Sequence, residues 1–217
     1  MIDEIRYLRD RFGLIYFSIR DDTFTANRRR VIEFCRLLLQ ERIFILWNCQ
    51  SRVNALDGEM LGWMKRAGCE CIQLGVESGS KRVLESVGKS ITPAEAEYAS
   101  SLVRDAGIRL SVYLIAGNIL EDEQDIAATC RLVEAMQPND GQVSPLVYYP
   151  GTELFEQGVI NGSIAADLFE RDRSPSCQVR VDGTVVKNTK KLLRSLASAA
   201  DRASFTAADF VRQKTML

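Results

Sequence analysis

Five short apolar segments recur along the chain at fairly even spacing, and they are rich in β-branched and aromatic residues. These segments are residues 14–19, 43–47, 71–76, 110–116 and 142–148. Segments with apolar residues at helical spacing lie between most of them. Strands that alternate with helices form a parallel sheet with right-handed crossovers, which either closes into a barrel or stays open. Because the strands are apolar throughout, we expect helices to cover the sheet.

Capping residues mark the limits of several helices. Asp57 precedes a helical pattern that ends at Gly68, as expected for an N-cap and a C-terminal glycine. Thr92 and Glu95 form a capping box, with Pro93 at the first helical position. Further helices are predicted over residues 1–12 and 27–40, and over a segment that ends before Pro138. A helix over residues 1–12 would normally follow a strand, so the chain is expected to begin in the middle of a β/α unit.

The alternating pattern ends near Pro150-Gly151. A hairpin is predicted over residues 179–186 with its turn at Asp182-Gly183, followed by a helix over residues 190–203. Residues 159–178 carry no clear pattern and are expected to form a mobile loop, and residues 204–214 are expected to hold a short final helix. The sequence therefore predicts a barrel core over residues 1–157 and a C-terminal extension of helices and a candidate hairpin over residues 158–217.

The 217-residue chain contains no histidine, which excludes Ser-His-Asp hydrolysis, Cys-His proteolysis and His-ligated metal centres within it. The net charge of −1 gives no reason to expect nucleic acid or an anionic membrane as a partner. No apolar stretch is long enough to cross a bilayer, and the first residues do not resemble a secretory signal. The six cysteines are scattered through apolar segments, so we expect a cytoplasmic protein in a reducing compartment.

Polar residues follow each predicted strand at its carboxyl end, which is where parallel β/α folds place their sites. These residues are Asp21 and Asp22 after the first strand, Asn48, Gln50 and Arg52 after the second, Glu77 to Ser80 after the third, Gly117, Asn118 and Glu121 after the fourth, and Ser144, Tyr148 and Tyr149 at the fifth. Strand ends become polar in any fold, so this pattern alone does not identify a function. We expect Tyr148 and Tyr149 to pack at the mouth of the barrel.

Five sequence runs occur in an order and spacing that resemble the radical S-adenosylmethionine (radical SAM) superfamily. The likeness is to the branch of iron–sulfur oxidoreductases often found with a cobalamin-binding domain, and it covers roughly residues 1–157. The runs are FSIRDDTFT (17–25), WNCQSRV (47–53), MKRAGC with LGVESGS (64–69 and 74–80, followed by Leu84 and Lys89), IAG with Glu121 (115–117), and YPGT (149–152).

The resemblance implies an α/β fold, a partial TIM-like (β/α)6 barrel whose first strand is missing from this chain. It also implies a [4Fe-4S] cluster, held on a CxxxCxxC loop after that first strand, whose open iron chelates SAM. One electron, from a donor such as flavodoxin or ferredoxin, cleaves SAM to methionine and a 5′-deoxyadenosyl radical. The radical then abstracts hydrogen from a small-molecule or macromolecular substrate that the resemblance does not specify. A cobalamin in a separate domain is a further expectation from this branch.

Three matched positions concern the methionine end of SAM. Asp21 and Asp22 match the second-strand motif of the family, which faces the methionine amino group, and a carboxylate suits an ammonium there. Arg52 matches a third-strand position that meets the methionine carboxylate or the substrate. Alternative interpretations remain open, because the two aspartates could cap the following helix together with Thr25 or Asn27, and Arg52 could pair with Asp57 in a surface salt bridge.

Four further positions concern the ribose and adenine. Glu77 and Ser78 match the fourth-strand motif, which meets the ribose hydroxyls or the methionine end, whereas Glu77 could also be a carboxylate stabilised near a helix start. Ile115 and Gly117 match the fifth-strand motif that packs on adenine, with Gly117 permitting close backbone approach, although Gly117 could also be only a turn residue.

The sequence departs from the family pattern at two places. No CxxxCxxC occurs, and Cys69 and Cys71 have the wrong spacing, so we expect structural cysteines and no metal ligand. The usual Gly-Leu-Pro-Gly-Glu after the fifth strand is replaced by residues 117–121, GNILE. The hypothesis is therefore a catalytic-core fragment that is inactive alone, with no catalytic residue assigned.

Two alternatives come from other classes, namely a cluster-free binding module on the same fold and an unrelated β/α-barrel lyase that uses carboxylates. The missing strand would leave one sheet edge unpaired. We expect residues 1–12 or the C-terminal tail to cover that edge, or the chain to self-associate there.

Overall fold

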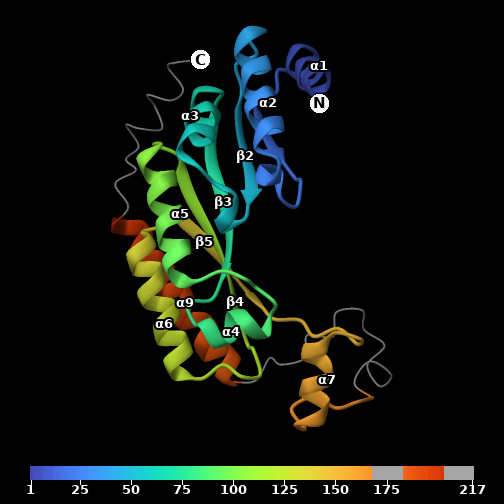
Figure 1. Ribbon diagram of the computed structural model, residues 1–217, viewed down its shortest axis with the longest axis vertical. Helices are drawn as coiled ribbons and strands as arrows, with labels where there is room; N and C mark the ends of the chain where they lie inside the picture. Colours follow the sequence, from blue (N-terminus) through green and yellow to red (C-terminus); the bar gives the residue numbers. More distant parts are fainter. Residues whose placement is uncertain (168–182, 203–217) are drawn as a thin grey trace.

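A five-stranded parallel sheet, with the strands in sequence order, forms the centre of the molecule in a computed structural model that describes residues 1–167 and 183–202 (Figure 1). The strands are β1 (Tyr16–Ile19), β2 (Leu46–Ser51), β3 (Cys69–Glu77), β4 (Arg109–Ala116) and β5 (Asp140–Pro145). Each strand pairs in parallel with the next one, so the sheet curves as a half-barrel. The predicted α/β fold, a partial TIM-like barrel, is confirmed.

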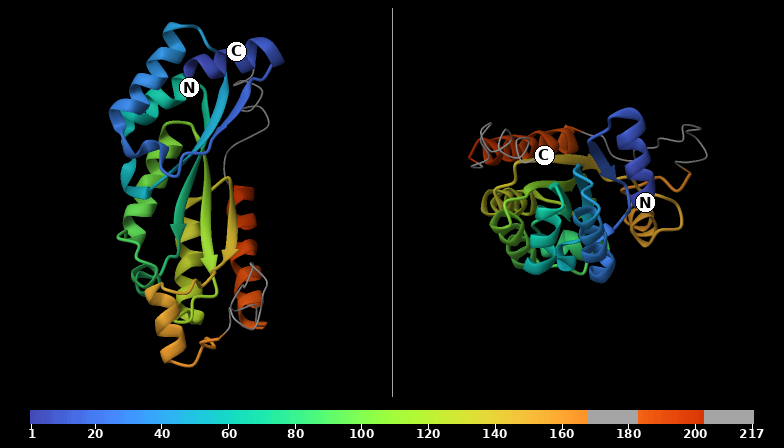
Figure 2. Two further views of the ribbon diagram at one scale, coloured as in Figure 1. Left: turned by 90° about the vertical axis from the view of Figure 1, so that its right-hand side faces the viewer. Right: turned by 90° about the horizontal axis from the view of Figure 1, so that it is seen from above.

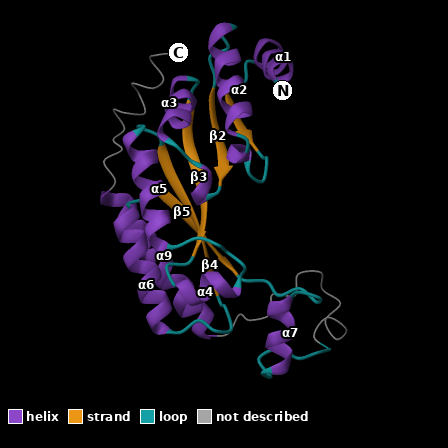
Figure 3. Ribbon diagram, viewed as in Figure 1, coloured by secondary structure: helices purple, strands orange, loops and turns teal. Residues whose placement is uncertain are grey.

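Helices cover one side of this curved sheet (Figures 2 and 3). The helices of the described residues are α1 (Ile2–Phe12), α2 (Arg28–Gln40), α3 (Gly58–Arg66), α4 (Lys81–Ser86), α5 (Pro93–Asp105), α6 (Glu123–Met136), α7 (Glu153–Ile160) and α9 (Gly183–Arg202), with short 3-10 helices η1 (Phe24–Ala26) and η2 (Val53–Ala55). Helix α7 lies beyond the carboxyl ends of the strands and does not cover the sheet (Figure 1). The expected caps are present, because Asp57 accepts from Met60 N and Thr92 and Glu95 form a complete capping box. These caps fix where α3 and α5 begin and therefore how long the preceding loops are.

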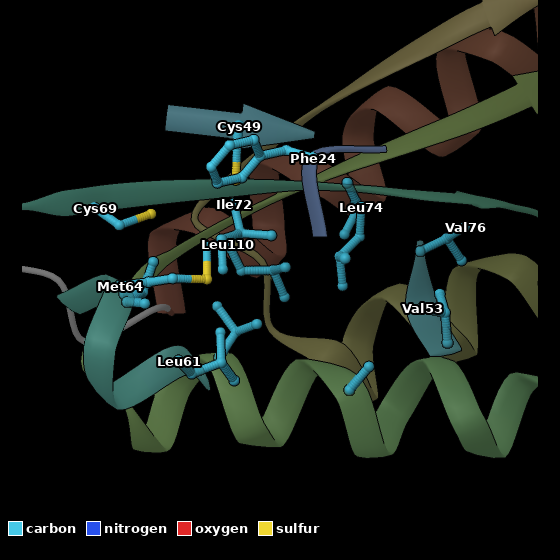
Figure 4. Packing of buried hydrophobic residues seen from close by; sticks show 14 of the residues in the cluster. Phe24, Cys49, Val53, Leu61, Met64, Cys69, Ile72, Leu74, Val76 and Leu110 are labelled. Atoms are coloured by element: carbon cyan, nitrogen blue, oxygen red, sulfur yellow. The ribbon is translucent and has the colours of Figure 1, made fainter. Parts of the chain in front are cut away.

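The apolar core lies between the sheet and the helices. Phe24, Phe34 and Trp47 pack edge to face with ring centroids 5.6–5.7 Å apart, and the Trp47 indole N–H donates to the Ala67 carbonyl. Ile72 and Leu74 of β3 lie in the same cluster, part of which Figure 4 shows. Aromatic pairs in this geometry contribute about 0.5–1.5 kcal/mol beyond the area that they bury. This cluster fixes the first three β/α units against one another.

Strand β2 begins three residues later than predicted and extends to Ser51. Ile43 and Ile45 are buried, which explains the apolar signal, but hydrogen bonding to the β1 side begins only with Leu46 N and the Ile15 carbonyl. Burial and strand pairing therefore coincide only in part in this segment. As a result, Gln50 and Ser51 belong to the strand rather than to the loop that follows it.

Helix α9 corrects the prediction for the C-terminal part. The hairpin is wrong for residues 183–186, because these residues form the first turn of α9. Residues 179–182, the predicted turn at Asp182 and the predicted helix over 204–214 lie outside the described residues. Apolar residues at helical spacing begin at Val185, and this longer pattern outweighs the short alternating stretch. Leu192, Leu196 and Ala199 of α9 belong to the main core cluster, so the helix packs with the sheet.

Strand β1 forms one edge of the sheet, and its Tyr16 side chain is half exposed. Helix α1 is anchored at the end of α2, where Arg6 pairs with Glu41 and Arg9 donates to the Arg42 carbonyl. Self-association through the β1 edge stays a prediction. If the chain self-associates there, its sedimentation coefficient should rise with protein concentration in analytical ultracentrifugation. A monomer with a bare β1 edge would contradict this prediction.

The contribution of α9 to the core is testable with two neighbouring leucines. Leu192 is fully buried, whereas Leu193 is 46% exposed. We expect Leu192→Ala to lower the free energy of unfolding by about 2–5 kcal/mol, because it leaves a cavity beside β5. Leu193→Ala should change it by less than about 0.5 kcal/mol. Urea unfolding followed by circular dichroism measures both variants, and equal effects would show that α9 is not part of the cooperative core.

Candidate functional site

The carboxyl ends of all strands lie at one edge of the sheet, because the strands are parallel (Figure 1). The predicted residues gather along this edge: Asp21 and Asp22 follow β1, Arg52 follows β2, Glu77 ends β3 and precedes Ser78, and Gly117 follows β4, which contains Ile115. Their convergence follows from topology, since neighbouring strands bring residues far apart in sequence to adjacent positions.

The inner face of the sheet, which is the side away from the helices, is polar. Side chains alternate along each strand, so Leu74 and Val76 enter the core while Gln73 and Glu77 lie on the opposite face. The other strands follow the same rule, and their inner positions include Ser18, Asn48, Gln50, Ser111, Tyr113, Gln142 and Ser144. A half-barrel lined by amides and hydroxyls is suited to a polar ligand rather than to a second apolar layer.

Polar contacts within the protein close the amino-terminal end of this inner face. Tyr16 Oη donates to Glu70 at 2.5 Å and accepts from Asn48 Nδ2 at 2.8 Å. Arg109 lies 3.7 Å from Glu70 and 3.1 Å from Asp140. Burial and the neighbouring Glu70 raise the pKa of Tyr16 to about 12, so the phenol stays protonated. Because these groups engage one another, the ligand-accessible part of the face is its carboxyl end.

Asp21 is held by an ion pair at the carboxyl edge. Its Oδ2 lies 2.6 Å from Arg30 of α2, and the hydrogen bond from Arg30 lowers the pKa of Asp21. The alternative capping role is wrong for both aspartates, because Asn27 caps α2 by accepting from Arg30 N. Asp22 is exposed and forms no ion pair with the residues that the structure describes.

Arg52 lies at the same edge as an exposed cation, without an ion pair in the described parts of the chain. The alternative pairing of Arg52 with Asp57 is wrong, since Asp57 binds Arg28 at 2.9 Å and caps α3. A hollow of about 270 Å³ separates Arg52 from Lys89 and has Gly75 on its wall. Two cations around one hollow suit a carboxylate or phosphate group.

Glu77 adopts a left-handed backbone conformation with φ 67°, at a point where the register between β3 and β4 shifts. This conformation is uncommon for a residue other than glycine and often marks a functional position. Glu77 Oε1 lies 2.9 Å from Lys89 Nζ, which also donates to the Gly75 carbonyl at 3.4 Å. The site prediction omitted Lys89, although Lys89 is part of the third matched run.

Ser78 is 1% exposed, and its hydroxyl group is engaged inside the protein. Its Oγ lies 3.1 Å from Thr129 Oγ1 of α6 and accepts from Ser80 N, while Gly79 N donates to Thr129 Oγ1 at 2.9 Å. Ser80 Oγ in turn donates to Asp125 at 2.6 Å. These bonds join the end of β3 to α6, and contact between Ser78 and SAM stays a prediction.

The loop over residues 117–121 is ordered although it lacks the proline and second glycine of the family pattern. Gly117, at φ 94°, donates its N–H to Glu121 Oε2 at 3.0 Å. Asn118 is buried, donates to Ser86 Oγ at 2.7 Å and accepts from Leu120 N at 2.9 Å. Side-chain hydrogen bonds thus replace the stiffness of proline. The half-buried Ile115 lies beside Ser144 on the inner face.

The cysteines of the described residues do not fit an iron–sulfur cluster. Cys35, Cys49 and Cys69 lie in the apolar core, and burial raises the pKa of the Cys35 and Cys71 thiols to about 12. Cluster ligands must be thiolates, which burial disfavours. Residues 1–167 and 183–202 contain no group of three His, Cys, Asp or Glu that could hold a metal ion. Cys177 lies outside these ranges.

Comparisons with known proteins identify the family and the fold of this chain. The family model described as Radical SAM superfamily matches residues 1–133. An uncharacterized methyltransferase of Pyrococcus horikoshii is 32% identical over 194 residues, and the match covers 89% of this chain and 42% of that protein. The anaerobic magnesium-protoporphyrin IX monomethyl ester cyclase of Cereibacter sphaeroides is 30% identical over 161 residues, covering 72% of this chain and 26% of the cyclase. The chain therefore spans less than half the length of these curated relatives.

A solved structure shares the fold. The methyltransferase TsrM from Kitasatospora setae, described as a radical S-adenosylmethionine enzyme with cobalamin and a [4Fe-4S] cluster bound, superposes with a TM-score of 0.64 at 18% identity. The superposition covers 76% of this chain and 34% of TsrM, and at this identity it establishes the fold alone. In the described part of the chain, no helix has the length and hydropathy needed to cross a membrane.

The junction between Ser78–Ser80 and α6 requires glycine at position 79. A Cβ at Gly79 would lie 2.6 Å from the Ala128 carbonyl oxygen and 2.7 Å from Thr129 Cα. We expect Gly79→Ala to lower the free energy of unfolding by about 1–3 kcal/mol. Gly58→Ala is the control, because a Cβ there meets nothing within 4 Å, and we expect its stability to be unchanged or higher by about 0.5–1 kcal/mol. Thermal unfolding measures both variants, and equal stabilities of Gly79→Ala and Gly58→Ala would contradict the close approach of Gly79 to α6.

The buried thiols should resist alkylation in the folded protein. With a pKa of about 12 for Cys35 and Cys71, roughly one thiol in ten thousand is a thiolate at pH 8. We expect iodoacetamide to label these two positions only after unfolding in urea, as measured by peptide mass spectrometry. Because their pKa values are raised, the stability that they contribute should fall as the pH rises from about 9 towards 12. Rapid labelling of Cys35 in the native protein would contradict its burial.

Proposed function

Because its family-model match spans residues 1–133, the chain belongs to the radical SAM superfamily, and we propose that it supplies the SAM-binding surface of an enzyme that cleaves SAM reductively. The products are methionine and a 5′-deoxyadenosyl radical. One observation carries the proposal, namely the convergence of Arg52 and the Glu77–Lys89 pair on the carboxyl edge of a polar half-barrel. In this proposal the substrate lies on the polar inner face below this edge.

The methionine end of SAM is a zwitterion, and the carboxyl edge offers both signs of charge. Arg52 and Lys89 receive the carboxylate, since they border one hollow. Asp21 and Asp22 lie beyond β1 and receive the ammonium. Charge-assisted hydrogen bonds of this kind are stronger than neutral ones, so they orient the amino acid end as well as bind it.

Glu77 and the β4–α6 loop serve the nucleoside end in this proposal. Glu77 Oε2 accepts from a ribose hydroxyl while Lys89 holds the other carboxylate oxygen. Ile115 supports the adenine ring, and Gly117 lets the base approach the backbone because it carries no side chain. Ser78 contributes by fixing the end of β3 through Thr129.

We also propose that the cluster ligands come from polypeptide outside these 217 residues, since the described cysteines do not fit a cluster. A flavodoxin or ferredoxin then supplies the electron, in a reducing cytoplasm. A cobalamin in a separate domain would suit methyl transfer, the reaction after which the Pyrococcus horikoshii relative is named. The cysteines that do not fit an iron–sulfur cluster also favour a second candidate function. This candidate is a binding module on the same fold that holds SAM or a similar nucleoside without cleaving it.

SAM binding tests the proposal directly. We expect the protein to bind SAM in isothermal titration calorimetry and Glu77→Ala to weaken binding about tenfold, because it removes a charged hydrogen-bond acceptor. Glu97→Ala is the matched control, since Glu97 is an exposed carboxylate on α5. Affinity that is unchanged in Glu77→Ala, or no binding by the unaltered protein, would refute the proposed site.

A further inference from the structure

Two side chains from elements downstream of residue 133 hold the loop that follows β4. This loop runs from Gly117 to Glu121 and ends at Asp122, the N-cap of α6. Tyr148 follows β5, and Asn188 lies on α9, so both residues are beyond the segment that the family model matches. The loop itself belongs to that segment, but its conformation depends on later parts of the chain.

Tyr148 bridges two backbone groups of the loop with one hydroxyl group. Its Oη accepts from Ile119 N at 2.7 Å and donates to the Gly117 carbonyl at 2.9 Å. The side chain is 1% exposed and packs with Phe155, Ile164 and the partly buried Ile119 in a small apolar cluster. Because a phenol both donates and accepts, this one residue fixes the carbonyl and the amide on either side of Asn118.

Asn188 acts on the same loop through Glu121. Glu121 Oε2 accepts from Gly117 N at 3.0 Å and from Asn188 Nδ2 at 3.3 Å. Asn188 is 7% exposed, so its amide is shielded from water where it meets the carboxylate. The adjacent Lys187 pairs with Glu123 at 2.9 Å, which adds a second link between α9 and the start of α6. Helix α9 thereby fixes the carboxylate that holds Gly117.

We propose that Tyr148 and Asn188 are positioning residues for the adenosine end of SAM, an inference that rests on the proposed function. They hold Gly117 and Ile119 in the conformation that receives the base, in place of the proline and glycine that the family pattern has there. A loop ordered before the ligand arrives loses less conformational entropy on binding. Both residues act on the loop at the nucleoside end in this proposal, so we expect their effect to be confined to the nucleoside half of the ligand.

The test compares two adjacent tyrosines. Tyr148→Phe removes the bridging hydroxyl and keeps the ring, whereas Tyr149→Phe alters a side chain that is 59% exposed. We expect Tyr148→Phe to raise the dissociation constant for 5′-methylthioadenosine about tenfold and to leave that for free methionine unchanged, with both probes measured by saturation-transfer NMR. Tyr149→Phe should change neither constant. Amide hydrogen exchange at Ile119, whose N–H the Tyr148 hydroxyl binds, should accelerate in Tyr148→Phe and not in Tyr149→Phe.

We expect Asn188→Ala to raise the dissociation constant for 5′-methylthioadenosine about threefold, which is less than the effect of Tyr148→Phe. Lys190→Ala is the control, because Lys190 is an exposed residue of the same helix. A Tyr148→Phe variant that binds 5′-methylthioadenosine as tightly as the unaltered protein would overturn the positioning role and leave the proposed function standing. Equal losses for both probes would reduce Tyr148 to a general structural residue and also overturn the inference. Failure of the unaltered protein to bind either probe would overturn the proposed function together with the inference.

Discussion

Parallel pairing of the five strands is the constraint on which the rest of the structure depends. It places the carboxyl ends of all five strands at the same edge. The pleat of each strand, in turn, directs alternate side chains to opposite faces of the sheet. The apolar set, including Trp47, Ile72 and Leu110, meets the helices, which leaves the polar set on an open inner face. A polar face for a ligand therefore results from the same alternation that builds the core.

Most of the fold was predictable because local signals agreed with the tertiary structure. The capping residues Asn27, Asp57 and Thr92 start their helices as the sequence indicates, and the apolar runs of β3 and β4 coincide with the strands. The predicted limits of β2 and α9 were wrong because a local sequence signal did not match the tertiary structure. Ile43 and Ile45 are buried without strand pairing to β1, and the start of α9 was obscured by a short stretch with turn residues.

The positions of the candidate site residues in the fold were predictable, but the contacts that these residues make were not. Sequence runs located Glu77 and Gly117, yet Glu77–Lys89, Asp21–Arg30 and Ser78–Thr129 are contacts that depend on how elements pack. The helix after β3 returns Lys89 to the strand end, 12 residues after Glu77, and only the folded chain reveals this. Tyr148 likewise holds a loop that lacks the proline of the family pattern, because its hydroxyl group binds the Ile119 N–H and the Gly117 carbonyl.

The most direct measurement of the central claim is a crystal structure of the protein with SAM. We expect the methionine carboxylate between Arg52 and Lys89, and adenine beside Ile115 and Gly117 at the carboxyl edge. This expectation would be contradicted by SAM elsewhere, for example in the apolar cavity near Phe44 and Cys69 at the amino-terminal edge, or by no bound SAM at saturating concentration. The first result would show that this half-barrel binds SAM at its carboxyl edge. The contradicting results would show that the chain shares the fold without this SAM site.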